Sequence, residues 1–126
     1  MRFRLNQRKR AYLKGRWGEK IAALYLRLKG YNIIETRFKT PMGEIDLLAR
    51  KGRALIAVEV KSRSSLEQAA FAVTPFQMRR IERALLYYLS RYHFHRHAFS
   101  LDLRFDVVLI APMKWPHHIK GAWYGT

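Results

Sequence analysis

The sequence contains no cysteine, which excludes a disulfide scaffold, a thiolate metal site and a thiol nucleophile. Acidic residues are scarce, because nine Asp and Glu stand against 25 Lys and Arg. The longest apolar run, Val107–Met113, falls far short of the ~18 residues that a membrane-spanning helix needs. Residues 1–16 are basic and lack the apolar segment of a signal peptide. These absences predict a protein of the reducing cytoplasm without a membrane span.

The formal net charge of +16 implies a polyanionic partner, because a compact domain of that charge repels itself. Nucleic acid is the leading candidate, since Lys and Arg that replace counterions on phosphates gain affinity from counterion release. An anionic membrane surface and a solubilising surface charge are the alternatives. The length of 126 residues and the 49% of hydrophobic residues indicate one globular domain.

A first helix is predicted over residues 15–29, where one apolar stripe recurs at helical spacing: Trp17, Ile21, Leu24 and Leu28. Its far side carries a smaller apolar strip of Ala22, Ala23 and Leu26. A second helix begins at Pro75, after the N-cap Thr74, and Gln77 completes a capping box. Its apolar face consists of Ile81, Leu85, Tyr88 and Tyr92.

Strands are predicted over Tyr31–Phe38, Glu44–Arg50, Ala54–Lys61 and Leu101–Leu109. The resulting order, α-β-β-β-α-β, is typical of an α/β fold with a mixed central sheet flanked by helices. Ser62–Phe71 is expected to be a loop. Around a core of residues 15–110, residues 1–14 form a basic lead-in, and residues 111–126 are a tail without an assigned structure.

Three of the nine acids fall on two neighbouring predicted strands. The two-residue period puts Glu44 and Asp46 on one strand face, and Glu59 and Lys61 on one face of the next strand. If the hairpin brings Asp46 beside Glu59, two carboxylates and an ammonium meet. Adjacent carboxylates repel each other unless a cation separates them, and Mg²⁺ prefers oxygen ligands. The pattern thus indicates a metal site for phosphodiester hydrolysis, with Lys61 at the attacking water.

The alternative is a solvated cross-strand ion pair, which is what Glu-X-Lys on a strand usually forms. Asp46 and Glu59, however, lie in the apolar runs Ile45–Leu48 and Ala57–Val60. Strands this apolar are expected to be buried on both faces, where an unpaired charge is costly. This favours a functional role for the three residues together.

Ordered sequence blocks resemble the PD-(D/E)XK nuclease signature. They are Gly43–Ala49, which contains Asp46, and Val58–Lys61, with twelve residues between Asp46 and Glu59. Three flanking blocks narrow the match: Gly15–Glu19, Ala72–Pro75 and Arg104–Val108. Over residues 15–110 the whole resembles the YraN family of predicted endonucleases, which is similar to archaeal Holliday-junction resolvases.

The resemblance implies a restriction-endonuclease-like αβββαβ core. It also implies Mg²⁺, with Mn²⁺ as an alternative, at Asp46, Glu59 and the backbone carbonyl of Val60, with Lys61 at the water. Glu19 would complete the catalytic set. The residues alone support Glu19 less strongly, since an acid near a helix N-terminus is favourable anyway and Arg16 is a potential partner. A basic residue is common in the family at position 77, where Gln77 stands here.

Several other residues are open to two interpretations. Glu44 is a second-layer acid or a hairpin ion pair, and Asp106 is expected to pair with Arg104. The alternating histidines of the His93–His97 segment are expected to contact phosphate or solvent rather than a metal. Trp115 and Trp123 are expected in the core rather than stacked on bases. The expected nucleic-acid contacts are basic residues of the two helices: Arg16, Lys20, Arg79, Arg80 and Arg83.

The leading hypothesis is a divalent-metal-dependent endonuclease that acts on nucleic acid, with DNA favoured and branched DNA as one candidate. The alternative is a non-catalytic nucleic-acid-binding module with structural acids. An interaction protein for ribosomes or anionic membranes would leave the acids unexplained. No small-molecule cofactor is expected. A homodimer would suit symmetric cutting of a junction, and the two-sided first helix and the aromatic tail are its candidate interfaces.

Overall fold

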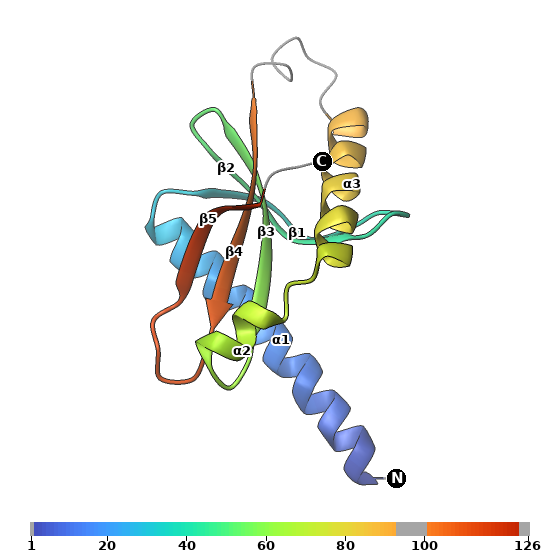
Figure 1. Cartoon of the computed structure of the whole chain (residues 1–126), viewed down its shortest axis with the longest axis vertical. Coiled ribbons are helices and arrows are strands. Elements are labelled where there is room, and N and C mark those ends of the chain that lie inside the picture. Colours follow the sequence, from blue (N-terminus) through green and yellow to red (C-terminus); the bar gives the residue numbers. More distant parts are fainter. Residues whose placement is uncertain (1, 93–100, 124–126) are drawn as a thin grey trace.

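The structure, a computed structural model of the chain, describes residues 2–92 and 101–123. Its elements are α1 (Arg2–Leu28), β1 (Asn32–Lys39), β2 (Glu44–Lys51), β3 (Ala54–Ser62), α2 (Leu66–Phe71), α3 (Pro75–Tyr92), β4 (Asp102–Ile110) and β5 (His117–Trp123). The five strands form one mixed sheet in the order β1-β2-β3-β4-β5, flanked by helices (Figure 1). β1, β2 and β3 form an antiparallel meander, β4 runs parallel to β3, and β5 is antiparallel to β4.

This architecture confirms the predicted α/β fold with a mixed central sheet, and it is consistent with a restriction-endonuclease-like core. β3 is covered on both faces, as its apolar run predicts. Ile56 and Val58 pack in one core cluster with α1, whereas Leu55 and Ala57 pack in another with α3. Because side chains alternate along a strand, α1 and α3 lie on opposite faces of the sheet.

The two apolar strips of α1 lie in different environments. Its small strip faces the sheet, since Ala22, Ala23 and Leu26 are buried in the core. The larger stripe faces outward, with exposed fractions of 62% for Trp17, 43% for Ile21, 58% for Leu24 and 79% for Leu28. Close helix–sheet contact favours the small side chains, because they let the backbones approach.

The structure replaces one expected loop in part with a helix and gives defined elements to two segments for which the sequence assigns no firm structure. α1 is one continuous helix from Arg2, so residues 2–14 extend it. The expected loop Ser62–Phe71 contains α2, whose N-cap Ser65 accepts a hydrogen bond from the Gln68 N–H at 3.1 Å. The tail contributes β5, which pairs with β4. Short polar helices and edge strands carry weak periodic signals, which explains why sequence patterns miss them.

The two tail tryptophans differ in environment. Trp123 stacks on Phe105 with 5.1 Å between ring centroids and packs against the core, as expected. Trp115 is 85% exposed, so its expected place in the core was wrong. None of the helices in the described part of the chain is long and apolar enough to cross a membrane.

Candidate active site

Asp46 of β2 and Glu59 of β3 line one cleft beside α1. The β2–β3 register ends with Leu47 paired with Val58, and Asp46 and Glu59 are the next residues of the two strands. The Val60 N–H donates a hydrogen bond to Asp46 Oδ2 at 2.8 Å. The two carboxyl groups also share a hydrogen bond. The predicted pair of acids is therefore assembled by the hairpin register.

The pKa of Glu59 is raised to about 9. Burial is the largest cause, followed by the hydrogen bond with Asp46 and the negative charge of Asp46, while Lys61 and the Val60 N–H oppose the rise. Glu59 is only 8% exposed, so water screens this repulsion poorly. At neutral pH the pair thus retains a proton, and a cation would relieve the same repulsion.

The pair opens into a cleft of about 630 Å³ between α1, the sheet and the segment that leads into α2. Glu19 and Lys61 line the same cleft as Asp46 and Glu59. Its remaining lining residues are Gly15, Val60, Ser62, Arg63, Ser64 and Gln68. The four residues with predicted catalytic roles therefore face one space.

Gln77 contacts Lys61, which its predicted capping role does not explain. The Gln77 backbone N–H donates to Thr74 Oγ1 at 3.2 Å, so Thr74 is the N-cap of α3 as expected. Amide orientation is assigned from the surrounding donors and acceptors. In the orientation that satisfies both ends, Gln77 accepts from Lys61 Nζ at 3.2 Å and donates to the Ala72 carbonyl at 3.0 Å. Gln77 thus holds the Lys61 ammonium from the α3 side.

Glu19 reaches the cleft from α1. A Cβ atom added at Gly18 would lie 3.1 Å from Ser62 Cβ, so glycine lets α1 approach β3 closely. Arg37 Nε donates to Glu19 Oε2 at 2.7 Å. Burial is the largest influence on the pKa of Glu19 and raises it, the bond from Arg37 lowers it, and the net change is upward. Glu19 of α1 thus forms an ion pair with Arg37 of β1.

A second, basic groove of about 280 Å³ adjoins the cleft between α1 and β1. Glu19 lines both spaces. The groove also contains two of the predicted nucleic-acid contacts together with two further arginines: Arg16, Lys20, Arg27 and Arg37. A chain of phosphates that leaves the cleft along α1 would meet these cations.

The other predicted contacts lie elsewhere. Arg79, Arg80 and Arg83 are exposed on α3, and they do not line the cleft as the structure describes it. Glu44 is exposed and stands opposite Lys39 in the β1–β2 register. The His93–His97 segment lies outside the described residues.

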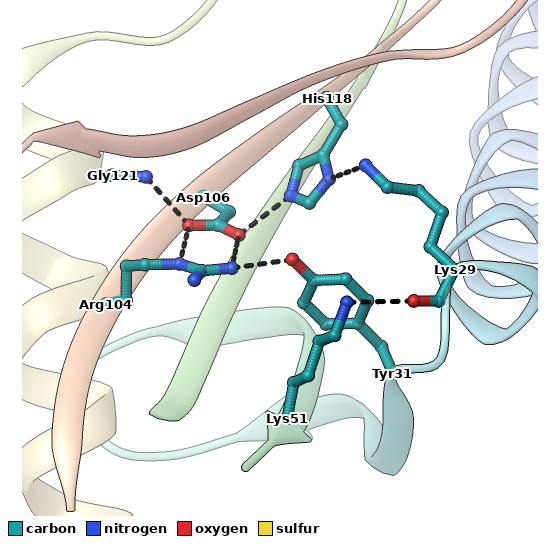
Figure 2. A network of polar contacts seen from close by, with 7 residues as sticks. All are labelled: Lys29, Tyr31, Lys51, Arg104, Asp106, His118 and Gly121. Atoms are coloured by element: carbon teal, nitrogen blue, oxygen red, sulfur yellow. Dashed lines mark hydrogen bonds and ion pairs between the residues drawn. The ribbon is translucent and has the colours of Figure 1, made fainter. Parts of the chain in front are cut away.

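Sequence reasoning missed a second polar centre on the α1 face, shown in Figure 2. The expected Asp106–Arg104 pair is present at 2.8 Å, but Asp106 is fully buried and also bonds to His118 Nε2 at 2.8 Å. Burial alone would raise the pKa of Asp106, yet the bonds from His118, Arg104 and Gly121 outweigh it and hold this pKa at about 2. His118 lies in the tail, where strand pairing brings it near β4 and no local motif marks it.

The donors available for a metal are two carboxylates. Within residues 2–92 and 101–123, no group of three or more His, Asp or Glu side chains gathers closely enough to hold an ion. Mg²⁺ commonly keeps several waters and needs only one or two carboxylates besides substrate phosphates. Asp46 and Glu59 fit that requirement, because they are two carboxyl groups in contact that line an open cleft.

Comparison with known proteins identifies the family. The model of "Uncharacterised protein family UPF0102" matches residues 18–110. A UPF0102 protein of Parvibaculum lavamentivorans is 54% identical over 113 residues, which are 90% of this chain and 83% of the relative. A UPF0102 protein of Brucella canis is 47% identical over 118 residues, 93% of this chain and 91% of the relative. The matches span most of both chains, and the protein belongs to the UPF0102 family.

Proposed function

We propose that the protein is a divalent-metal-dependent endonuclease that hydrolyses phosphodiester bonds in nucleic acid. The observation that carries this proposal is the contact between Asp46 and Glu59 in an open cleft that Lys61 also lines. DNA is the favoured substrate, and branched DNA is one candidate form, because of the resemblance to junction resolvases. A non-catalytic binding module would not require two acids in contact inside so basic a protein.

In this proposal Asp46 and Glu59 hold Mg²⁺ or Mn²⁺, with the Val60 carbonyl as the further ligand that the resemblance implies. When bound, the metal supplies Lewis acidity to the phosphoryl oxygen and lowers the pKa of a bound water. To hold the ion, the carboxyl pair would have to lose the proton that it shares, so that both acids would act as anions. The pair therefore works as a ligand set only after it has lost its proton.

Lys61 and Glu19 act on the substrate side of the cleft. The Lys61 ammonium, held by Gln77, orients the attacking water and offsets the charge that develops on the phosphoryl group. Water adds to phosphorus and one P–O bond breaks, which leaves a phosphate monoester and a hydroxyl end. Glu19 borders the cleft and the basic groove, where Arg16, Lys20 and Arg37 would direct the strand toward the metal.

The test is cleavage of labelled duplex, junction and single-stranded DNA in Mg²⁺, Mn²⁺ or EDTA. We expect metal-dependent cutting that falls by at least about a hundredfold in Asp46→Asn, Glu59→Gln and Lys61→Ala, while DNA binding persists. A matched control is Glu35→Gln, which removes an exposed carboxylate from β1 and should cut normally. Equal cutting by the wild type and all three site variants would show a contaminating nuclease and overturn the proposal.

A further inference from the structure

In the polar centre around Asp106, both oxygens of the Asp106 carboxylate are fully engaged in hydrogen bonds. Asp106 Oδ1 accepts from Arg104 Nε at 2.8 Å and from the Gly121 N–H at 2.9 Å. Asp106 Oδ2 accepts from Arg104 Nη2 and from His118 Nε2, both at 2.8 Å. A carboxylate offers about four acceptor sites, so Asp106 cannot neutralise another cation by direct contact.

The bond to Asp106 fixes the state of His118, which then positions Lys29. His118 Nε2 faces the carboxylate and carries the proton, so Nδ1 is left as an acceptor. Nδ1 lies 2.7 Å from Lys29 Nζ. The ammonium of Lys29, one residue beyond the end of α1, is thus anchored to the sheet instead of extending into solvent (Figure 2).

Two more lysines gather at this point. Lys51 Nζ donates to the Lys29 carbonyl at 3.0 Å and lies 4.7 Å from the ring centroid of Tyr31. Lys120, on β5, is close enough for its charge to act on Lys29. The pKa of Lys29 is lowered by partial burial first, and then by the charges of Lys120 and Lys51. The fold therefore holds three ammonium groups together at an electrostatic cost that a bound anion would remove.

We propose that Lys29, Lys51 and Lys120 form a second binding site for a backbone phosphate of nucleic acid, separate from the candidate active site. This inference rests on the proposed function, because it takes the substrate to be nucleic acid. Lys29 follows Glu19 by ten residues, which at the helical rise corresponds to about 15 Å along α1. The substrate would thus extend roughly four to five base pairs beyond the scissile bond to reach the lysines.

The experiment measures the binding of a fluorescent 30-base-pair duplex by anisotropy at several NaCl concentrations, in EDTA so that no cutting occurs. The test variant carries Lys29→Gln, Lys51→Gln and Lys120→Gln. The control variant carries Lys39→Gln, Arg91→Gln and Lys114→Gln, which remove the same charge from exposed positions elsewhere. A third variant replaces the three cluster lysines with arginine. Thermal denaturation shows whether each variant is folded, and a Lys51→Gln/Lys120→Gln double variant serves if loss of Lys29 prevents folding.

We expect the test variant to bind about tenfold more weakly or worse at 0.1 M NaCl, with a salt slope smaller by roughly two to three. The control variant should lose less than one unit of slope, and the arginine variant should keep the wild-type slope.

Equal slopes in the test and control variants would overturn the inference and leave the nuclease proposal standing. Failure of the wild type to bind nucleic acid at all would overturn both. Titration of the wild type with inorganic phosphate separates the two sources of phosphate. Displacement of the duplex by phosphate from the wild type, but not from the test variant, would support a backbone contact at the lysines. Phosphate binding that depends on the lysines but leaves duplex binding unchanged would assign the site to the free ion and contradict a backbone contact.

Discussion

The carboxyl groups of Asp46 and Glu59 share a hydrogen bond between two neighbouring strands, and the contact helps to raise the pKa of Glu59 to about 9. A single buried acid can have a purely structural role. Two acids in contact destabilise the folded state, because their negative charges repel each other. This cost to stability is consistent with a site where a cation or a substrate interacts with both acids. The predictions below start from this pair and then test the surrounding structure.

Glu59→Gln should stabilise the metal-free protein at pH 8. The folded pKa of Glu59 exceeds its ordinary value of 4.5, so the folded state binds the extra proton, and stability falls as the pH rises from about 4.5 to about 9. Removing this titration should raise the free energy of unfolding at pH 8 by about 1–2 kcal/mol, with little gain at pH 4.5. Urea denaturation at both pH values measures this, and an equal loss of stability at both would contradict the raised pKa.

Cleavage should depend on pH through competition between the metal and the shared proton. At a low Mg²⁺ concentration the rate should rise between pH 6 and about 9, because deprotonation of the Asp46–Glu59 pair creates the ligand set. A tenfold increase in Mg²⁺ should move the midpoint of the rise to lower pH by up to about one unit. Initial rates measured over this pH range at two Mg²⁺ concentrations test the prediction. A midpoint that is the same at both Mg²⁺ concentrations would show that the titration is not linked to metal binding.

Glu19→Gln should lower kcat by roughly ten- to a hundredfold and leave the affinity for DNA nearly unchanged. The Glu19 carboxylate borders the cleft and forms an ion pair with Arg37. Single-turnover kinetics separate kcat from binding, with Glu35→Gln as the matched exposed control. A purely structural Glu19 would instead lower the stability and leave the rate of the folded protein intact.

Asp106→Asn should destabilise the protein by about 2 kcal/mol or more near neutral pH, because it weakens the bonds that Arg104 and His118 make. The folded pKa of about 2 lies below the ordinary 3.8, so the stabilisation is present above pH 4 and is lost as the pH falls toward 2. The wild type should therefore lose its advantage over the variant between pH 4 and pH 2. A difference that stays constant over this range would contradict the lowered pKa.

Leu26 and Leu24 provide a matched pair for the orientation of α1. Leu26 is fully buried, whereas Leu24 is 58% exposed. Leu26→Ala should cost about 2–5 kcal/mol of unfolding free energy, and Leu24→Ala less than about 1 kcal/mol. Urea denaturation at pH 7 compares the two. The reverse order would mean that the outward stripe of α1 packs against the sheet.

The central sheet could be predicted because its strands are marked by local patterns. The apolar run of β3 requires cover on both faces, and the turns at Thr40–Gly43 and at Gly52 fix the β1–β2–β3 meander. The apolar strip of α1 that packs against the sheet could not be identified from such a local pattern. Helical periodicity finds both of its apolar strips, but it does not show that Ala22 and Ala23 fit closer to the sheet than Trp17.

The residues of the candidate site also fall into a group that local sequence patterns predict and a group that they do not. Asp46, Glu59 and Lys61 are predictable because a hairpin with a two-residue period brings them together. The Lys61–Gln77 contact and the Glu19–Arg37 pair depend on how helices dock on the sheet, which one sequence does not encode locally. His118 was missed because its partners Lys29 and Asp106 come from distant parts of the chain.

The central claim is that Asp46 and Glu59 hold a divalent cation, and a crystal of the wild-type protein soaked in Mn²⁺ tests it most directly. Anomalous diffraction should show one Mn²⁺ peak between the two carboxylates, at oxygen distances near 2.2 Å, and no such peak in Glu59→Gln crystals. A soaked wild-type crystal in which Asp46 and Glu59 still share their hydrogen bond, with Mn²⁺ absent or bound elsewhere, would contradict the account.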